Sequence, residues 1–154
     1  MIQHFEQDCR EIASLKAQYF RFMDTKDYVG LDRLFAPDAV IDVRGSGGAA
    51  DAGAVETLDG DAGLMDGIAF CQFLRVTLPP LVTVHHGHMP EFTALPDGRI
   101  AAIWAMEDRI LFPADSRIRT LHGWGHYHDV YVRGDDGAWI IAAMTLTRLR
   151  VDTV

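Results

Sequence analysis

The chain has 154 residues, of which 49% are hydrophobic, and its formal net charge at pH 7 is −8. This length and composition predict a single domain, 1–154, with a core of its own. The negative charge argues against nucleic acid or an anionic membrane as a partner, because both attract basic patches. The two cysteines form no CxxC pair, and we find neither a signal-peptide pattern nor an apolar run long enough to span a membrane. We therefore expect a cytoplasmic protein.

The N-terminal part of the chain is expected to be helical, because apolar residues recur at three- and four-residue spacing. These residues are Ile12, Leu15, Tyr19, Phe22 and Met23, and the charged residues fall mostly on other faces. Asp27 is placed to cap a second, shorter helix over residues 28–35. The alternating sequence 39–44 then predicts a strand after Pro37.

Residues 45–63 are dense in glycine, alanine and acidic residues, a composition that rarely forms a packed element. We expect a loop there, either a lid over a pocket or a disordered segment. Apolar spacing over residues 64–78 favours a third helix, which Pro79 and Pro80 would end.

The second half of the chain changes to long alternating runs separated by turn residues. The runs cover residues 82–93, 99–112, 118–132 and 139–150. Such runs are typical of hairpins in a meander of antiparallel strands. The predicted fold class is therefore α+β, with N-terminal helices packed in a curved, mostly antiparallel sheet.

Six of the seven histidines fall in two short clusters, and one acid between the clusters, Asp108, is expected to lie on an apolar strand face. Its neighbours on that face are Trp104, Met106, Ile110 and Phe112. A buried acid needs a partner. The partner is either Arg148, in a structural ion pair, or His85, whose protonated form Asp108 would stabilise. We favour His85, because its strand directly precedes that of Asp108 and is expected to pair with it.

The other histidines divide between the two faces of the expected sheet. If His85 points inward, His86 and His88 point to the opposite face, toward a helix, a neighbouring subunit or water. In the later strand, one face carries His122, Trp124, His126 and His128. His86 and His88 with Glu91 form a pattern that could bind zinc, iron or manganese. Two histidines at this spacing are a weak signal, so a metal is the second choice and no metal site is predicted.

Two residues near the end of the first helix are candidates for chemistry. Tyr19 lies on the apolar stripe, where the simplest interpretation is that its ring packs in the core. Asp24 sits at the helix end that disfavours a carboxylate, so a specific partner or a raised pKa is expected there. Their spacing of five residues does not place them on one helical face, and they would converge only if the helix unwinds near Asp24.

Three parts of the sequence resemble the SnoaL-like branch of the nuclear transport factor 2-like superfamily. They are the helix-helix-strand opening, the segment 34–39 and the closing meander that ends at 137–139. The resemblance covers nearly the whole chain and implies a conical α+β barrel with one deep pocket. Since this fold hosts isomerases, dehydratases, cyclases and non-catalytic subunits, it does not decide function.

A closer likeness concerns the segments 16–24, 84–91 and 104–108, which resemble the corresponding stretches of bile acid 7α-dehydratases and, more distantly, scytalone dehydratases. The catalytic residues implied by this resemblance are Tyr19, Asp24, His85 and Asp108. A further active-site tyrosine of those enzymes falls on Val43, which has no hydroxyl. The resemblance also implies a homotrimer.

These observations predict a dehydratase or double-bond isomerase that needs no cofactor and acts on a small hydrophobic cyclic compound, such as a steroid, polyketide or aromatic. His85 is the expected general base, with Asp108 fixing its tautomer. Tyr19 and a protonated Asp24 are expected to donate hydrogen bonds to the developing oxyanion. The residues expected to contact the substrate are Val43, Trp104, Met106 and Tyr127. The alternatives are a non-catalytic ligand-binding or polyketide-cyclase-like protein, and the small subunit of a ring-hydroxylating dioxygenase.

Overall fold

The computed structural model describes residues 2–47 and 63–154, so most of the expected loop or lid over 45–63 lies outside the described residues. The helices are α1 (Ile2–Thr25), α2 (Tyr28–Asp32) and α3 (Gly67–Thr77), with a short 3₁₀ helix, η1 (Arg44–Gly47). The strands are β1 (Phe35–Asp42), β2 (Leu64–Met65), β3 (Val82–Gly87), β4 (Glu91–Ala94), β5 (Ile100–Leu111), β6 (Thr120–Arg133) and β7 (Trp139–Thr153). Within the described part of the chain, no helix is long and apolar enough to cross a membrane.

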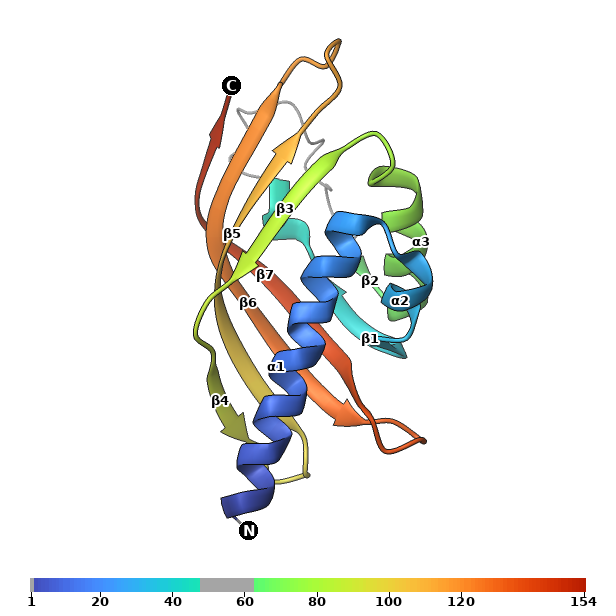
Figure 1. The fold of residues 1–154 in the computed structure, drawn as a ribbon, viewed down its shortest axis with the longest axis vertical. Helices are drawn as coiled ribbons and strands as arrows, with labels where there is room; N and C mark the ends of the chain where they lie inside the picture. Colours follow the sequence, from blue (N-terminus) through green and yellow to red (C-terminus); the bar gives the residue numbers. More distant parts are fainter. Residues whose placement is uncertain (1, 48–62) are drawn as a thin grey trace.

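The strands form one curved open sheet in the order β2-β1-β7-β6-β5-β3, and β4 also pairs with β5. All strand pairs are antiparallel except β1 with β7. The long strands β5, β6 and β7 bend along the length of α1, and α2 and α3 lie near the C-terminal end of that helix (Figure 1). The structure confirms the predicted α+β class and the mostly antiparallel curved sheet.

Helix α1 lies against the concave face of the sheet because its apolar stripe is long and continuous. Ile12 and Tyr19 are at most 1% exposed to solvent, and Leu15 and Met23 are also buried. The helix packs mainly against β3 and also contacts β7. The three- and four-residue spacing of apolar residues thus places one side of α1 in the core, and this packing positions the C-terminal end of the helix beside β3.

Several element boundaries differ from those expected. Helix α3 begins at Gly67 rather than residue 64, because the Asp66 side chain accepts a hydrogen bond of 2.7 Å from the Ala69 amide and caps the helix there. The run 82–93 is divided into β3 and β4, and the break contains Pro90, which has no amide hydrogen to donate. The predicted cap at Asp27 is confirmed, with the Gly30 amide 2.9 Å from its carboxylate.

Strand periodicity sorts the histidines as expected. Thr83 and His85 are buried on the concave face of the sheet, whereas His86 on the same strand is exposed. In β6, Tyr127 is buried on the concave face and His128 is exposed on the other. The two-residue period of a strand therefore separated His85 from His86 as expected, and the structure shows that His85 is the one that points inward.

Candidate active site

A cavity of about 550 Å³ lies between the sheet, the second half of α1 and α3. Most of the side chains around it are apolar. Its polar lining includes Tyr19, Thr83, His85, Asp108, Tyr127 and Arg148. A largely apolar cavity with a few converging polar groups is the usual form of a small-molecule site.

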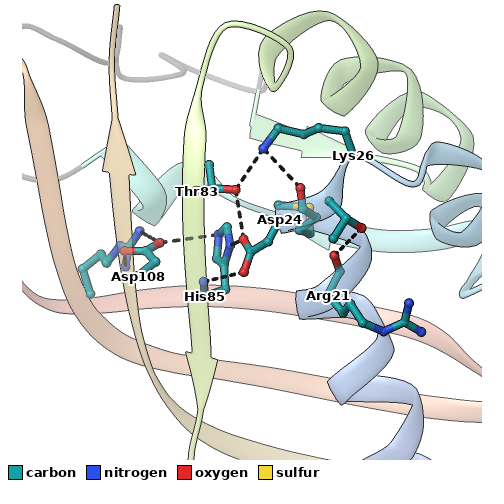
Figure 2. Close-up of polar contacts among 9 residues, drawn as sticks. Arg21, Asp24, Lys26, Thr83, His85 and Asp108 are labelled. Carbon is teal, nitrogen blue, oxygen red and sulfur yellow. Dashed lines mark hydrogen bonds and ion pairs between the residues drawn. The ribbon is translucent and has the colours of Figure 1, made fainter.

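His85 and Asp108 are brought together as the sequence predicts. The two residues are direct partners in the β3–β5 register, and both side chains line the cavity. The distance from His85 Nε2 to Asp108 Oδ2 is 4.0 Å, which is too long for a hydrogen bond. Figure 2 shows the His85 imidazole between Asp24 and Asp108.

The direct partner of Asp108 is Arg148 on β7. Arg148 Nη1 and Nη2 donate to the two carboxylate oxygens of Asp108 at 2.9 and 2.7 Å. Both side chains are more than 90% buried. The ion pair that the sequence offered as the alternative therefore forms. Asp108 does not hold the His85 imidazole as expected, because the two groups lie 4.0 Å apart.

The group that holds the imidazole is Asp24. Its Oδ1 lies 2.7 Å from His85 Nδ1, and its Oδ2 accepts a bond of 2.9 Å from the His85 backbone amide. Thr83 Oγ1 donates to Asp24 Oδ1 at 2.9 Å. Burial raises the pKa of Asp24, but the hydrogen bonds from His85 and Thr83 outweigh burial, and the pKa lies below its usual value.

Asp24 is consequently a carboxylate and not the protonated donor of the expected mechanism. Of the two outcomes that the helix-end argument offered, the structure shows a specific partner rather than a raised pKa. Its oxygens face N–H and O–H donors, which stabilise the charged form at an unfavourable helix end. Because a carboxylate only accepts, the proton in the His85–Asp24 contact belongs to Nδ1. In the neutral form of the imidazole, Nε2 is then the nitrogen without a proton, and it lies beside the cavity.

Tyr19 and Asp24 reach the site without unwinding of the helix, because α1 remains helical to Thr25. Tyr19 lines the cavity, and its ring lies edge-on to Tyr127 with the centroids 5.9 Å apart. Burial is the main cause that raises the pKa of both phenols, and for Tyr19 the hydrogen bond and charge of Tyr127 add to it. Both hydroxyls thus remain protonated donors at neutral pH.

Four side chains were expected to contact a substrate, and two of them, Val43 and Tyr127, line the cavity. Trp104 and Met106 share the concave face but are not among the lining residues, which corrects the expectation for them. Trp104 donates to the Tyr131 hydroxyl at 3.2 Å, and the sulfur of Met106 lies 3.4 Å from Arg148 Nη1. The two-residue period of a strand fixes the face of the sheet on which a side chain lies. It does not fix whether that part of a curved strand reaches the cavity.

The sequence analysis missed a second buried ion pair, Lys16 with Asp129. Lys16 Nζ lies 2.7 Å from Asp129 Oδ2, and both side chains are fully buried. The Tyr131 hydroxyl donates to the same oxygen at 2.6 Å. A signal was available, since Lys16 is four residues after Ile12 and three before Tyr19 on the apolar stripe, and Asp129 shares the inward face of β6 with two tyrosines.

Gly123 on β6 makes room for the Asp108–Arg148 pair. A Cβ atom at this position would lie 2.4 Å from Arg148 Nη1 and 2.7 Å from Asp108 Oδ1. The ion pair therefore requires a glycine beneath it.

The histidines of the convex face make other contacts. His86 Nδ1 lies 3.4 Å from one oxygen of Glu107, and His122 Nε2 lies 3.2 Å from the other. Among residues 2–47 and 63–154, no three side chains of metal-ligating type are placed to hold an ion. The pattern of His86 and His88 with Glu91 therefore gains no support as a metal site.

The curved sheet, the helices on its concave face and a large apolar cavity with its histidine–carboxylate contact define a class of small α+β domains built around a ligand-sized pocket. Residues 7–145 match the SnoaL-like domain family, and the chain belongs to that family. The resemblance inferred from the sequence is confirmed at this level.

Solved structures with the same fold are similar over nearly the whole chain. A protein from Novosphingobium aromaticivorans, provisionally described as a scytalone dehydratase, matches with a TM-score of 0.79 and 16% identity over 100% of this chain and 92% of that one. A hexachlorocyclohexane dehydrochlorinase from Novosphingobium barchaimii matches with a TM-score of 0.78 and 13% identity, covering 100% and 94%. A second Novosphingobium aromaticivorans protein, provisionally described as an aromatic ring hydroxylase, matches with a TM-score of 0.76 and 17% identity, covering 96% and 94%.

At these identities the similarity shows the fold alone. Two of the three matches carry names of lyases, which fits a family that contains lyase and isomerase activities. The nearer likeness to bile acid 7α-dehydratases stays a prediction.

Proposed function

We propose that this protein is a dehydratase or double-bond isomerase that uses His85 as general base on a hydrophobic cyclic substrate. The observation that carries the proposal is the position of the His85 imidazole. Its Nδ1 is held 2.7 Å from the Asp24 carboxylate, while its Nε2 lies beside an apolar cavity, 4.0 Å from Asp108. An imidazole held in this way can accept a proton at Nε2 from a ligand in the cavity.

The size and lining of the cavity support a ring compound as substrate. Its volume of about 550 Å³ lies in the range usual for small-molecule sites, roughly 300–1,000 Å³. The apolar lining includes Phe70, Leu74, Ile110, Leu121 and Leu146. Burial of a steroid-, polyketide- or aromatic-like ring against these side chains would supply the affinity, and the few polar groups would orient it.

In the first step, His85 Nε2 removes a proton from a carbon next to a carbonyl, and the electron pair of the C–H bond moves toward the carbonyl oxygen. The imidazolium that forms has the Asp24 carboxylate at Nδ1, and the Asp108–Arg148 ion pair lies near Nε2. The Asp24 carboxylate balances the new positive charge and lowers the barrier to proton abstraction.

The developing oxyanion needs stabilisation, and three side chains of the lining can provide it. The hydroxyls of Tyr19 and Tyr127 are buried, protonated hydrogen-bond donors. Arg148 also lines the cavity, and its guanidinium places a positive charge beside it.

The substrate decides the second step. If a hydroxyl lies β to the carbonyl, the imidazolium gives its proton to that hydroxyl, the C–O bond breaks and water leaves. If no leaving group is present, the imidazolium returns the proton to another carbon of the conjugated system, and a double bond has moved. Both routes return His85 to its neutral form.

The two alternative functions make different demands on the same cavity. A small subunit of a ring-hydroxylating dioxygenase predicts a pocket filled by side chains, and the open cavity of about 550 Å³ counts against that role. A non-catalytic ligand-binding protein is compatible with the cavity. It predicts binding of cyclic compounds without proton exchange, which the following experiment distinguishes.

The test uses two ring ketones as probes. The wild-type protein in D₂O should incorporate deuterium next to the carbonyl of 2-tetralone, followed by proton NMR, and should convert 3-hydroxy-1-tetralone to 1-naphthol if it is a dehydratase. His85→Gln should lower the deuteration rate by roughly 10²–10⁴-fold. The matched control is His86→Gln, the exposed neighbour on the opposite face of β3, which should keep the wild-type rate.

Equal rates for His85→Gln and the wild type would refute His85 as the base. Saturable binding of 2-tetralone by wild-type protein, with deuteration no faster than in buffer, would favour the ligand-binding alternative.

A further inference from the structure

The corner between α1 and α2 contains a lysine in a backbone conformation that favours glycine. Lys26 has φ 61°, and among the described residues it is the only non-glycine residue with positive φ. The Asp27 amide bonds to the Phe22 carbonyl at 2.9 Å and the Lys26 amide to the Met23 carbonyl at 3.4 Å, which is the Schellman pattern of a helix end. Glycine is usual at the position that Lys26 occupies, because a Cβ atom is strained there.

The side chain of Lys26 reaches back toward the site. Its Nζ lies 3.1 Å from Thr83 Oγ1, and Thr83 Oγ1 lies 2.9 Å from Asp24 Oδ1 (Figure 2). Asp24 Oδ1 is also the atom that contacts His85 Nδ1. The three contacts form a chain from the helix corner to the imidazole.

The directions of the hydrogen bonds in this chain follow from the donors available. An ammonium group can only donate, so Thr83 Oγ1 accepts from Lys26. The single hydroxyl proton of Thr83 is then left for Asp24, and Asp24 accepts from both Thr83 and His85. The direction of each hydrogen bond in this chain of contacts therefore fixes the direction of the next one.

We propose that Lys26 is a positioning residue of the His85–Asp24 pair: through Thr83 it keeps Asp24 an acceptor, so that His85 carries its proton on Nδ1 and presents Nε2 to the cavity. The proposal rests on the proposed function of His85 as a base. It also explains why a lysine stands at a corner that glycine would occupy with less strain, because only a long cationic side chain reaches Thr83 from there.

The competing interpretation is structural, since Lys26 Nζ also lies 3.4 Å from the Met23 carbonyl at the helix end. Lys26→Gly separates the two, because glycine relieves the backbone and removes the side chain. We expect its melting temperature to equal or exceed that of the wild type. Lys26→Asn serves as a second variant, because asparagine also tolerates a positive φ.

The first readout is the His85 tautomer in the full chain labelled with ¹⁵N-histidine, observed by long-range ¹H–¹⁵N NMR at neutral pH. The wild type should show the Nδ1–H form, and Lys26→Gly and Thr83→Val should show a larger share of the Nε2–H form. Lys26→Arg, which retains the positive charge, should restore the wild-type spectrum. An unchanged tautomer in Lys26→Gly would overturn the proposal and leave Lys26 as a helix cap.

The second readout is deuteration of 2-tetralone. Lys26→Gly should lower kcat about tenfold, the loss expected for one charge-assisted hydrogen bond, with KM unchanged. The double variant Lys26→Gly/Thr83→Val should lose no more than either single variant, because both break the same chain. Since the tautomer is observed without turnover, a wild-type protein that fails to deuterate 2-tetralone would refute the proposed function while the NMR comparison still decides the role of Lys26.

Discussion

Two buried ion pairs lie inside the curve of the sheet, and they differ in access. Asp108 and Arg148 line the cavity, and Arg148 keeps one buried N–H without a partner among the described residues. Lys16 and Asp129 are fully buried, and neither is part of the cavity lining. The rings of Tyr127 and Tyr19 cover the Lys16 ammonium, with centroids 3.8 and 4.6 Å from Nζ.

The difference shows that a charged pair in an apolar interior is not by itself a functional site. The Lys16–Asp129 pair is closed by aromatic rings and by the Tyr131 hydroxyl, so its groups have no room for a ligand. The Asp108–Arg148 pair stands beside an imidazole and an open cavity. Each pair leaves one buried polar atom without a hydrogen-bond partner among the described residues, Arg148 Nε and Asp129 Oδ1. Access to the cavity, rather than burial, therefore marks the Asp108–Arg148 pair as a candidate for chemistry.

The largest effect on stability is expected from breaking the closed pair. Lys16→Met leaves Asp129 as an uncompensated buried carboxylate, and the free energy of unfolding, measured with urea, should fall by about 3–5 kcal/mol. Adding Asp129→Asn removes that charge and should recover most of the loss. The control is Arg99→Met, which breaks the exposed pair with Asp97 and should cost much less than Lys16→Met, because solvent screens that pair. Equal losses in Lys16→Met and Arg99→Met would contradict the importance of burial.

A smaller effect is expected beneath the pair in the cavity wall. Gly123→Ala places a Cβ atom 2.4 Å from Arg148 Nη1 and should cost about 1–3 kcal/mol of unfolding free energy, because the buried guanidinium must move. It should also slow the deuteration of 2-tetralone. Gly134→Ala is the matched control, since its nearest neighbours lie at 3.4 Å, and it should change stability by less than about 0.5 kcal/mol. If both glycine variants behave alike, the close approach at Gly123 is unimportant.

The smallest effect is a change in the pH dependence of stability. The pKa of Asp24 is lower in the folded protein than its usual value, mainly because hydrogen bonds from His85 and Thr83 outweigh burial. The unfolded chain therefore takes up a proton at this residue before the folded chain does as the pH falls. The stabilisation from Asp24 is present above about pH 4 and is lost as the pH falls through the folded pKa.

Asp24→Asn should therefore flatten the curve of unfolding free energy against pH between pH 5 and the acid limit, with the largest difference from the wild type above about pH 4. Urea unfolding at several pH values measures it. Curves that run parallel in the wild type and Asp24→Asn would show that this carboxylate is not specifically stabilised in the folded protein.

The sequence predicted well those features that depend on short repeats. The three-to-four residue spacing of α1 identified its buried stripe, and the two-residue period of β3 separated His85 from His86 and His88. The pairing of the strands that carry His85 and Asp108 was also predicted, whereas the register that sets the two residues opposite each other comes from the structure. The family resemblance carried the choice of Tyr19, Asp24, His85 and Asp108, and their catalytic roles remain predictions.

The tertiary structure alone decided which acid holds which base. Asp24 and His85 are separated by 61 residues, and Asp108 and Arg148 by 40, so no local pattern specifies either contact. The docking of α1 against β3 brings Asp24 to the imidazole, and the pairing of β7 with β6 brings Arg148 to Asp108. Periodicity fixes the side of an element on which a residue lies, because it follows from backbone geometry. Its partner depends on how whole elements pack, which is set by the sum of many weak contacts across the fold.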